Sequence, residues 1–188
     1  MSVIQVRGTS GSGKTTVMRR VMASFPAGWT GIGVPGRKKP LYYTLNGRMG
    51  SNLPRVHVLG HYETACGGCD NIGSAAKVYE MIQMLETLDS SDSIILCEGL
   101  LLSEDFKWTS QLPGVKVLFL NTSEEECLRR VKARRLAAGN EKELNPANTV
   151  NRLAVIARAK VKLIDAGIYC RTASSGQAPR IVLNWMIG

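Results

Sequence analysis

Short, mostly apolar runs alternate along this chain with longer segments of helical periodicity. The apolar runs predict strands buried on both faces of a sheet, and they lie at residues 3–6, 94–97 and 116–120. The helical segments carry apolar residues three or four positions apart and lie at residues 14–25, 74–88, 124–138 and 148–165. Strands that alternate with helices predict parallel pairing. We therefore expect an α/β fold of three layers, with a mainly parallel five-stranded sheet and helices on both faces.

Three segments add to this alternation. Residues 41–45 and 55–60 have strand composition, and the residues between them favour a hairpin, in particular Asn46-Gly47 and Gly50-Ser51-Asn52. Residues 180–184 predict a last strand at the end of the chain. Residues 26–40 are rich in glycine and proline and predict a basic loop, which carries Arg37, Lys38 and Lys39.

The composition limits the class of protein. A chain of 188 residues with 44% hydrophobic and 21% charged residues suits one soluble domain. It has no apolar run of the length of a secretion signal or membrane span, so we expect a cytoplasmic protein. The five cysteines are an odd number and favour reduced thiols. The net charge of +9 favours polyanionic partners but is equally compatible with solubility alone.

The clearest chemical signal lies between the first predicted strand and the first predicted helix. Residues 8–15 read GTSGSGKT, which satisfies the phosphate-binding pattern G-x-x-x-x-G-K-[ST] in the context that this motif requires. Its glycines let backbone N–H groups point at a phosphate, and the following helix adds its positive dipole end. We expect Lys14 to bridge the β- and γ-phosphates of ATP and Thr15 to bind Mg²⁺. The predicted nucleotide-binding residues are Gly8, Ser10, Gly11, Ser12, Gly13, Lys14, Thr15 and Thr16.

A carboxylate follows a buried strand later in the chain. Residues 94–99 read IILCEG, which places Glu98 where it can hold a Mg²⁺-bound water, although a strand-end acid can also simply hydrogen-bond a loop. With both motifs the chain resembles the P-loop kinase superfamily, in which a hydrophobic strand ending in Glu-Gly carries the second metal-binding acid, as in the uridine kinase-like enzymes. The resemblance implies a phosphotransferase that uses ATP and Mg²⁺, with Thr15 and Glu98 at the metal.

Residues 61–70, with the sequence HYETACGGCD, follow a predicted strand. The resemblance implies that this segment carries the site of the phosphate acceptor. An acid here could orient or deprotonate the attacking hydroxyl. Asp70 is the first candidate for this general base and Glu63 is the second. Asp70 could equally cap the helix that begins near Ser74, and Glu63 could anchor a loop.

The same segment contains aromatic, imidazole and thiol side chains. Tyr62 and His61 could stack on a nucleobase, or they could simply be packed. Cys66 and Cys69 form a C-x-x-C pair, but no second pair at metal-ligand spacing accompanies it, and both histidines lie upstream. We therefore expect neither a zinc site nor a thioredoxin-like redox site.

The helix predicted at residues 124–138 is strongly basic. A Ser/Thr cap followed by glutamates predicts where it begins. Its basic residues are Arg129, Arg130, Lys132, Arg134 and Arg135. The glutamates one turn earlier could pair with them and leave an ordinary solvated face. The resemblance to nucleotide-type kinases implies instead a lid near residues 122–147, in which Arg130 and Arg134 share a face and clamp the transferring phosphate.

Within the superfamily, the sequences GHYE and GGCD in residues 60–70 resemble those of bacteriophage kinases that phosphorylate 5-hydroxymethyluracil bases in DNA. This resemblance agrees with the positive charge and implies a DNA substrate, and action in the host cytoplasm if a phage encodes the chain. The lack of long apolar runs predicts no membrane partner, and the sequence implies no protein partner. We favour ATP-dependent phosphorylation of the hydroxymethyl group, by positioning and charge neutralisation. A kinase for a free nucleoside, nucleotide or other metabolite and a P-loop ATPase without an acceptor stay open. The candidate catalytic residues are Lys14, Asp70, Glu63, Arg130 and Arg134.

Overall fold

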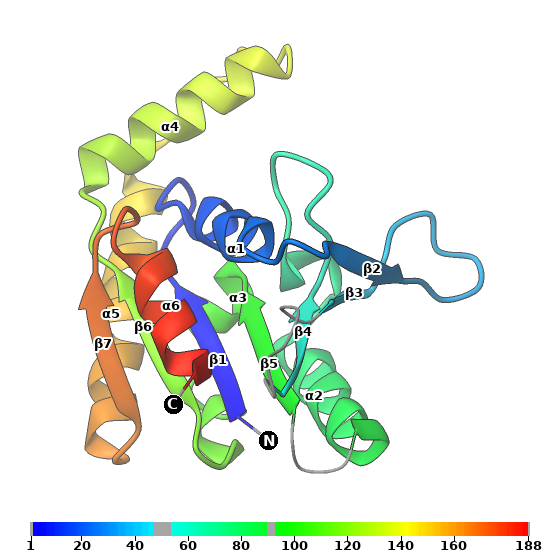
Figure 1. Ribbon diagram of the computed structural model, residues 1–188. Helices are drawn as coiled ribbons and strands as arrows, with labels where there is room; N and C mark the ends of the chain where they lie inside the picture. Colours follow the sequence, from blue (N-terminus) through cyan, green and yellow to red (C-terminus); the bar gives the residue numbers. More distant parts are fainter. Residues whose placement is uncertain (1, 47–53, 90–92, 188) are drawn as a thin grey trace.

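The protein is built around one central sheet (Figure 1). The computed structural model describes residues 2–46, 54–89 and 93–187, and over these residues the sheet has seven strands in the order β2-β3-β4-β5-β1-β6-β7. Their bounds are Ser2–Arg7 for β1, Trp29–Ile32 for β2, Tyr42–Leu45 for β3, Arg55–Leu59 for β4, Ser93–Glu98 for β5, Lys116–Leu120 for β6 and Tyr169–Ala173 for β7. Neighbouring strands from β4 to β7 run parallel, whereas β3 runs antiparallel to both β2 and β4.

Helices cover both faces of this sheet. Their bounds are Lys14–Ala23 for α1, Ala75–Asp89 for α2, Leu100–Ser103 for α3, Glu124–Ala137 for α4, Pro146–Asp165 for α5 and Ala178–Ile187 for α6. On one face, α1 and α6 share a buried core with Ile4 of β1, and on the other face α2 and α5 share one with Val3. Consecutive strand residues point to opposite faces, so β1 contributes to both cores. The expected α/β fold with a mainly parallel sheet is confirmed.

The strand predicted at residues 180–184 is wrong. This segment lies inside α6, where the buried residues Ala178, Val182 and Met186 recur every four positions and form one helical face against the core. The short apolar run within the segment hides that period. The edge position of the sheet is taken instead by β7, which pairs with β6. Most of β7 is exposed or half-buried, so no apolar run marks it in the sequence.

The sheet also gains β2, inside the segment predicted as a basic loop. β2 pairs antiparallel with β3, with Trp29 opposite Leu45. The predicted hairpin of the next two strands is confirmed, because β3 and β4 pair antiparallel. Its predicted turn residues at 47 and 50–52 lie outside the described residues. With β2 and β7 included, the sheet has seven strands where the sequence predicted five.

The carboxyl ends of the parallel strands meet at one edge of the sheet. Val6 of β1 pairs with Glu98 of β5, so the connection from β1 to α1 begins beside Glu98. β4 pairs with β5 on its other side, which brings the segment after β4 to the same edge. The connections that follow β6 and β7 also start there, because these strands run parallel to β1. Ligands of open parallel sheets bind at this edge.

Among the described helices, none combines the length and the apolar character that a membrane-spanning segment needs.

Candidate active site

A cavity of about 470 Å³ opens at the carboxyl edge of the sheet. Segments that lie far apart in the sequence line it: the loop before α1, the start of α1, the segment after β4, the end of β5, α4 and the connection after β7. The predicted site residues that line it are Ser10, Gly11, Gly13, Lys14, Thr15, Thr16, Asp70, Glu98, Arg130 and Arg134. Gly8, Ser12 and Glu63 do not line it.

The glycine-rich loop, defined here as residues 8–13, packs directly beneath α4. Gly11 and Gly13 have φ angles of 81° and 101°, which residues with a side chain rarely adopt. A Cβ atom on Gly11 would lie 2.4 Å from the carbonyl oxygen of Cys127 in α4. The hydroxyl of Thr122 donates a hydrogen bond of 2.8 Å to the carbonyl oxygen of Ser12. The first turn of α4 is therefore fixed to the loop.

Two polar groups of this region are buried beside the cavity. Oγ of Ser12 has no hydrogen-bond partner within the described ranges. Lys14 is 7% exposed, and its Nζ donates a hydrogen bond of 3.1 Å to the carbonyl oxygen of Thr9. A buried ammonium group is expensive to desolvate, and an anionic ligand in the cavity would compensate that of Lys14, which lines the cavity, whereas Ser12 does not.

Glu98 and Thr15 meet in the lining of the cavity. Oγ1 of Thr15 donates a hydrogen bond of 2.8 Å to Oε1 of Glu98. Glu98 is 1% exposed, and its burial raises the pKa of the carboxyl from 4.5 to about 7, although Lys14 opposes this shift. The backbone of Gly68 comes so close that a Cβ there would lie 2.5 Å from Oε1 of Glu98. The two predicted metal-binding residues are thus adjacent and offer the oxygen atoms that Mg²⁺ prefers.

The two candidates for the general base lie in different cavities. Asp70 is exposed and lines the 470 Å³ cavity together with Lys14 and Glu98. Its Oδ1 accepts a hydrogen bond of 3.2 Å from the backbone N–H of Leu101 and so caps α3, not α2. Glu63 lines a separate cavity of about 380 Å³. The geometry therefore favours Asp70 over Glu63 as the acid nearest the phosphate-binding residues.

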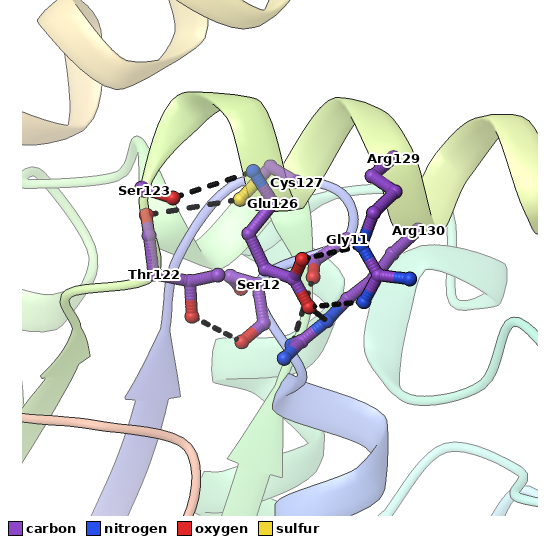
Figure 2. A network of polar contacts seen from close by, with 8 residues as sticks. All are labelled: Gly11, Ser12, Thr122, Ser123, Glu126, Cys127, Arg129 and Arg130. Carbon is purple, nitrogen blue, oxygen red and sulfur yellow. Dashed lines mark hydrogen bonds and ion pairs between the residues drawn. The ribbon is translucent and has the colours of Figure 1, made fainter.

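Helix α4 places Arg130 against the glycine-rich loop (Figure 2). As expected, Ser123 is its N-cap, and the Ser123 hydroxyl accepts a hydrogen bond of 3.3 Å from the backbone N–H of Glu126. Glu126 pairs with both Arg129 and Arg130, at 2.6 Å each, and these guanidinium groups lower the pKa of its carboxyl to about 2. Arg130 also donates a hydrogen bond of 3.3 Å to the carbonyl oxygen of Gly11. One glutamate thus orients Arg130 toward the loop.

The remaining basic residues of α4 separate into two groups. Arg134 lines the 470 Å³ cavity, as Arg130 does. Lys132 and Arg135 line a different hollow of about 320 Å³, which the connection between α4 and α5 completes. The predicted pair of Arg130 and Arg134 therefore faces one cavity, whereas their neighbours point elsewhere.

Comparison with known proteins adds one decisive observation. No protein-family model matches the chain. A protein of Pseudomonas phage PaMx11, named 5-hmdU DNA kinase, is 42% identical over 171 residues, which cover 88% of this chain and 87% of the phage protein. The chain belongs to the family of phage 5-hmdU DNA kinases. A protein of the same name from Pseudomonas phage M6 is 27% identical over 179 residues, which cover 89% of this chain and 88% of its own.

This member of the 5-hmdU DNA kinase family has site residues that its sequence did not reveal. Ser175 and Gly176, in the connection after β7, line the 470 Å³ cavity, and so does Arg20 of α1. A Cβ atom on Gly13 would lie 2.9 Å from Cβ of Ser175, so this connection touches the glycine-rich loop. The only available signal was the sequence Ser174-Ser175-Gly176, and without β7 it had no assigned place in the sheet.

The C-x-x-C pair of this 5-hmdU DNA kinase family member does not form a compact thiol site. Cys66 is exposed and lines the 470 Å³ cavity, whereas Cys69 is buried in the core, and burial raises the pKa of its thiol. Within the described part of the chain, no group of three or more His, Cys, Asp or Glu side chains could hold a metal ion. His61 and Tyr62 are also buried, at 2% and 7% exposure, so both are packed.

The buried Glu98 predicts a pH-dependent cost to the stability of this kinase-family chain. Because its pKa rises from 4.5 to about 7 in the folded protein, the folded state binds the extra proton between these values. The contribution of Glu98 to the free energy of unfolding therefore decreases as the pH rises through that window. Glu98→Gln keeps an acceptor for Thr15 and removes the charge, so it should stabilise the protein by up to about 3 kcal/mol above about pH 7.

Thermal unfolding with a chelator present checks this expectation across about pH 5 to pH 8. The difference between Glu98→Gln and the unsubstituted protein should grow with pH. A Glu98→Gln difference that is constant with pH would contradict the raised pKa.

Proposed function

We propose that this protein transfers the γ-phosphate of ATP to the hydroxymethyl group of 5-hydroxymethyluracil in DNA. The observation that carries this proposal is the 42% identity, over most of both chains, to a phage protein named 5-hmdU DNA kinase. The cavity supplies an independent physical argument, because it gathers a buried lysine, a strand-end carboxylate, a second acid and three arginines around one space. The phage origin of the relatives fits action on DNA in the host cytoplasm.

The glycine-rich loop fits the phosphates of a nucleotide and, in this proposal, acts as a P-loop. Gly11 and Gly13 allow backbone conformations that turn N–H groups inward, and the loop leads directly into the N-terminus of α1. The buried ammonium group of Lys14 lines the cavity and supplies a positive charge that such an anion would satisfy. Lys14 then holds the β- and γ-phosphates and neutralises charge during transfer.

Mg²⁺ fits beside Thr15 and Glu98. Their oxygen atoms are 2.8 Å apart, and the carboxylate is buried and destabilised as an anion, so a bound cation would stabilise its ionised form. When bound, Mg²⁺ supplies positive charge that stabilises the transferring phosphoryl group. Thr15 and Glu98 are the residues that would hold the ion.

Asp70 accepts the proton of the attacking hydroxymethyl group in this proposal. One of its oxygens is held by the backbone N–H of Leu101, which fixes the carboxylate in the cavity and leaves the other oxygen for the acceptor. Arg130 and Arg134 approach from α4, and the lid that they belong to spans residues 122–147 of the single domain. Their positive charges stabilise the phosphoryl group as it leaves ATP.

Arg134→Ala is expected to lower kcat for phosphoryl transfer by about tenfold to a hundredfold, because one charge that faces the transferring group is lost. Arg135→Ala is the matched control, since Arg135 is the next residue of α4 but lines a different hollow. Steady-state kinetics with saturating ATP and DNA measures both variants. Equal losses in the two variants would show that Arg134 has no special role.

The proposal is tested by transfer of labelled γ-phosphate to duplex DNA that contains 5-hydroxymethyluracil. Unmodified duplex, free nucleosides and nucleotides, and water are compared as acceptors in parallel. Label on the modified duplex alone supports the proposed function. Label on a free compound would make the protein a metabolite kinase, and release of phosphate without an acceptor would make it an ATPase.

A further inference from the structure

A second cavity lies beside the first and is different in character. It has a volume of about 380 Å³ and is lined by Arg19, Met22, Trp29, Tyr43, Tyr62 and Glu63. We call it the aromatic pocket. Four of these six side chains are aromatic or carry a thioether, and volumes of this size are typical of ligand sites. The proposed transfer reaction uses none of them, apart from the disfavoured alternative base Glu63.

The two cavities are neighbours along the same two segments. Helix α1 contributes Thr15 and Thr16 to the first cavity and Met22 to the aromatic pocket. The segment after β4 contributes Tyr62 and Glu63 to the aromatic pocket, whereas residues 65–67 line the first cavity. Arg19 donates hydrogen bonds to the carbonyl oxygens of Tyr62 and Thr64, which ties this segment to α1 between the cavities.

The surfaces of the aromatic pocket suit a flat aromatic ligand. Tyr43 and Tyr62 are buried, their ring centroids are 6.1 Å apart, and the hydroxyl of Tyr43 accepts a hydrogen bond of 3.2 Å from the backbone N–H of Tyr62. Trp29, on the edge strand β2, is 46% exposed. The other two tryptophans each contact a tyrosine ring. The exposed indole of Trp29, beside the buried rings of Tyr43 and Tyr62, therefore offers a face on which a flat aromatic ligand could stack.

The lining of the aromatic pocket carries one cation, Arg19, and one anion, Glu63, and further cations lie on α1 and on the connection from β2 to β3. Arg19 and Arg20 are exposed on α1, and Lys38 is exposed on the connection from β2 to β3. Arg37 of that connection donates a hydrogen bond of 3.2 Å to the carbonyl oxygen of Asn71, next to Asp70. An apolar metabolite would gain nothing from these cations, whereas a base attached to an anionic backbone would gain from both surfaces.

We propose that the aromatic pocket binds the nucleobase next to the target base in the DNA strand, stacked on Trp29. This inference rests on the proposed function. The target hydroxymethyl group must enter the first cavity, where Lys14 and Asp70 lie, so the base in the aromatic pocket is its neighbour in the strand. A stacked neighbour would hold the strand in register while the target base is extruded.

Trp29→Ala should raise the KM for DNA, and the Kd of the oligonucleotide, by about tenfold or more, and leave the KM for ATP unchanged. Trp29→Phe should recover most of the loss, because it retains an aromatic face. Tyr169→Ala is the matched control, since Tyr169 is 55% exposed on β7, the opposite edge strand. Thermal unfolding verifies that the variants are folded.

Substrates with one abasic residue on the 5′ or the 3′ side of 5-hydroxymethyluracil identify the occupant. For one of these two substrates, the missing base should raise the KM and Kd for DNA of the unsubstituted protein as much as Trp29→Ala does with the complete substrate. With that same abasic substrate, Trp29→Ala should cause no further increase. The inference is overturned if Trp29→Ala weakens DNA binding equally with both abasic substrates, or does not weaken it at all, while transfer to modified DNA continues. If no transfer occurs, the proposed function fails, and oligonucleotide Kd values measured by fluorescence anisotropy still decide the role of Trp29.

Discussion

Lys14→Ala is expected to lower kcat/KM for phosphoryl transfer by a factor on the order of a thousand. The ammonium group of Lys14 is almost fully buried in the lining of the cavity, next to the loop proposed to hold the nucleotide. In such a site a fixed positive charge acts with little screening, so its loss affects the transition state strongly. The substitution also removes the cation nearest the buried Glu98, whose ionised form Lys14 favours.

Steady-state transfer of labelled phosphate to modified duplex measures this loss. Lys107→Ala is a suitable control, because Lys107 is an exposed lysine that lies over the ring of Trp108, away from the cavity. It should retain full activity. A Lys14→Ala variant that is folded and loses less than about tenfold would contradict the assignment of this loop to the phosphates.

Asp70→Asn is expected to lower kcat at least about a hundredfold with little change in the KM for ATP. Asparagine keeps the Oδ1 atom that accepts the hydrogen bond from Leu101, so the cap on α3 survives while the base is lost. Glu63→Gln removes the other candidate and should reduce kcat far less, because Glu63 lies in the aromatic pocket. The two variants therefore separate the candidates directly.

The comparison of the two variants can also contradict this assignment. If Glu63→Gln instead abolishes transfer while Asp70→Asn remains active, the base lies in the segment after β4 but the geometric choice of Asp70 is wrong.

Short-range patterns predicted much of the cavity correctly. The phosphate-binding motif is continuous in sequence, and the buried runs around residues 3–6 and 94–97 predicted two strands that lie side by side. Their parallel register places the loop next to Glu98. Residues remote in sequence therefore meet because each strand has a continuous apolar run, which is typical of a strand buried in a parallel sheet. Asp70 was expected at the same carboxyl edge of the sheet, because it follows a predicted strand of that sheet.

The features that were missed depend on tertiary context. β7 is mostly polar and exposed, and it forms a strand because it pairs with β6, so Ser175 could not be assigned to the cavity. Trp29 lies in a segment dominated by glycine and proline, and β2 exists there because β3 offers it an edge. The helix α6 was mistaken for a strand because the half-buried Ile181 and Leu183 flank the buried Val182, and this continuous apolar run hides the helical period.

The most direct measurement of the central claim is the identity of the phosphorylated nucleoside. Duplex DNA with blocked 5′ ends and 5-hydroxymethyluracil at one position is incubated with the protein and ATP, digested to nucleosides and analysed by mass spectrometry. We expect one added phosphate on the hydroxymethyl group of 5-hydroxymethyldeoxyuridine, and none when Lys14→Ala replaces the protein. Phosphate on any other nucleoside, or none on the modified base while ATP is consumed, would contradict the account.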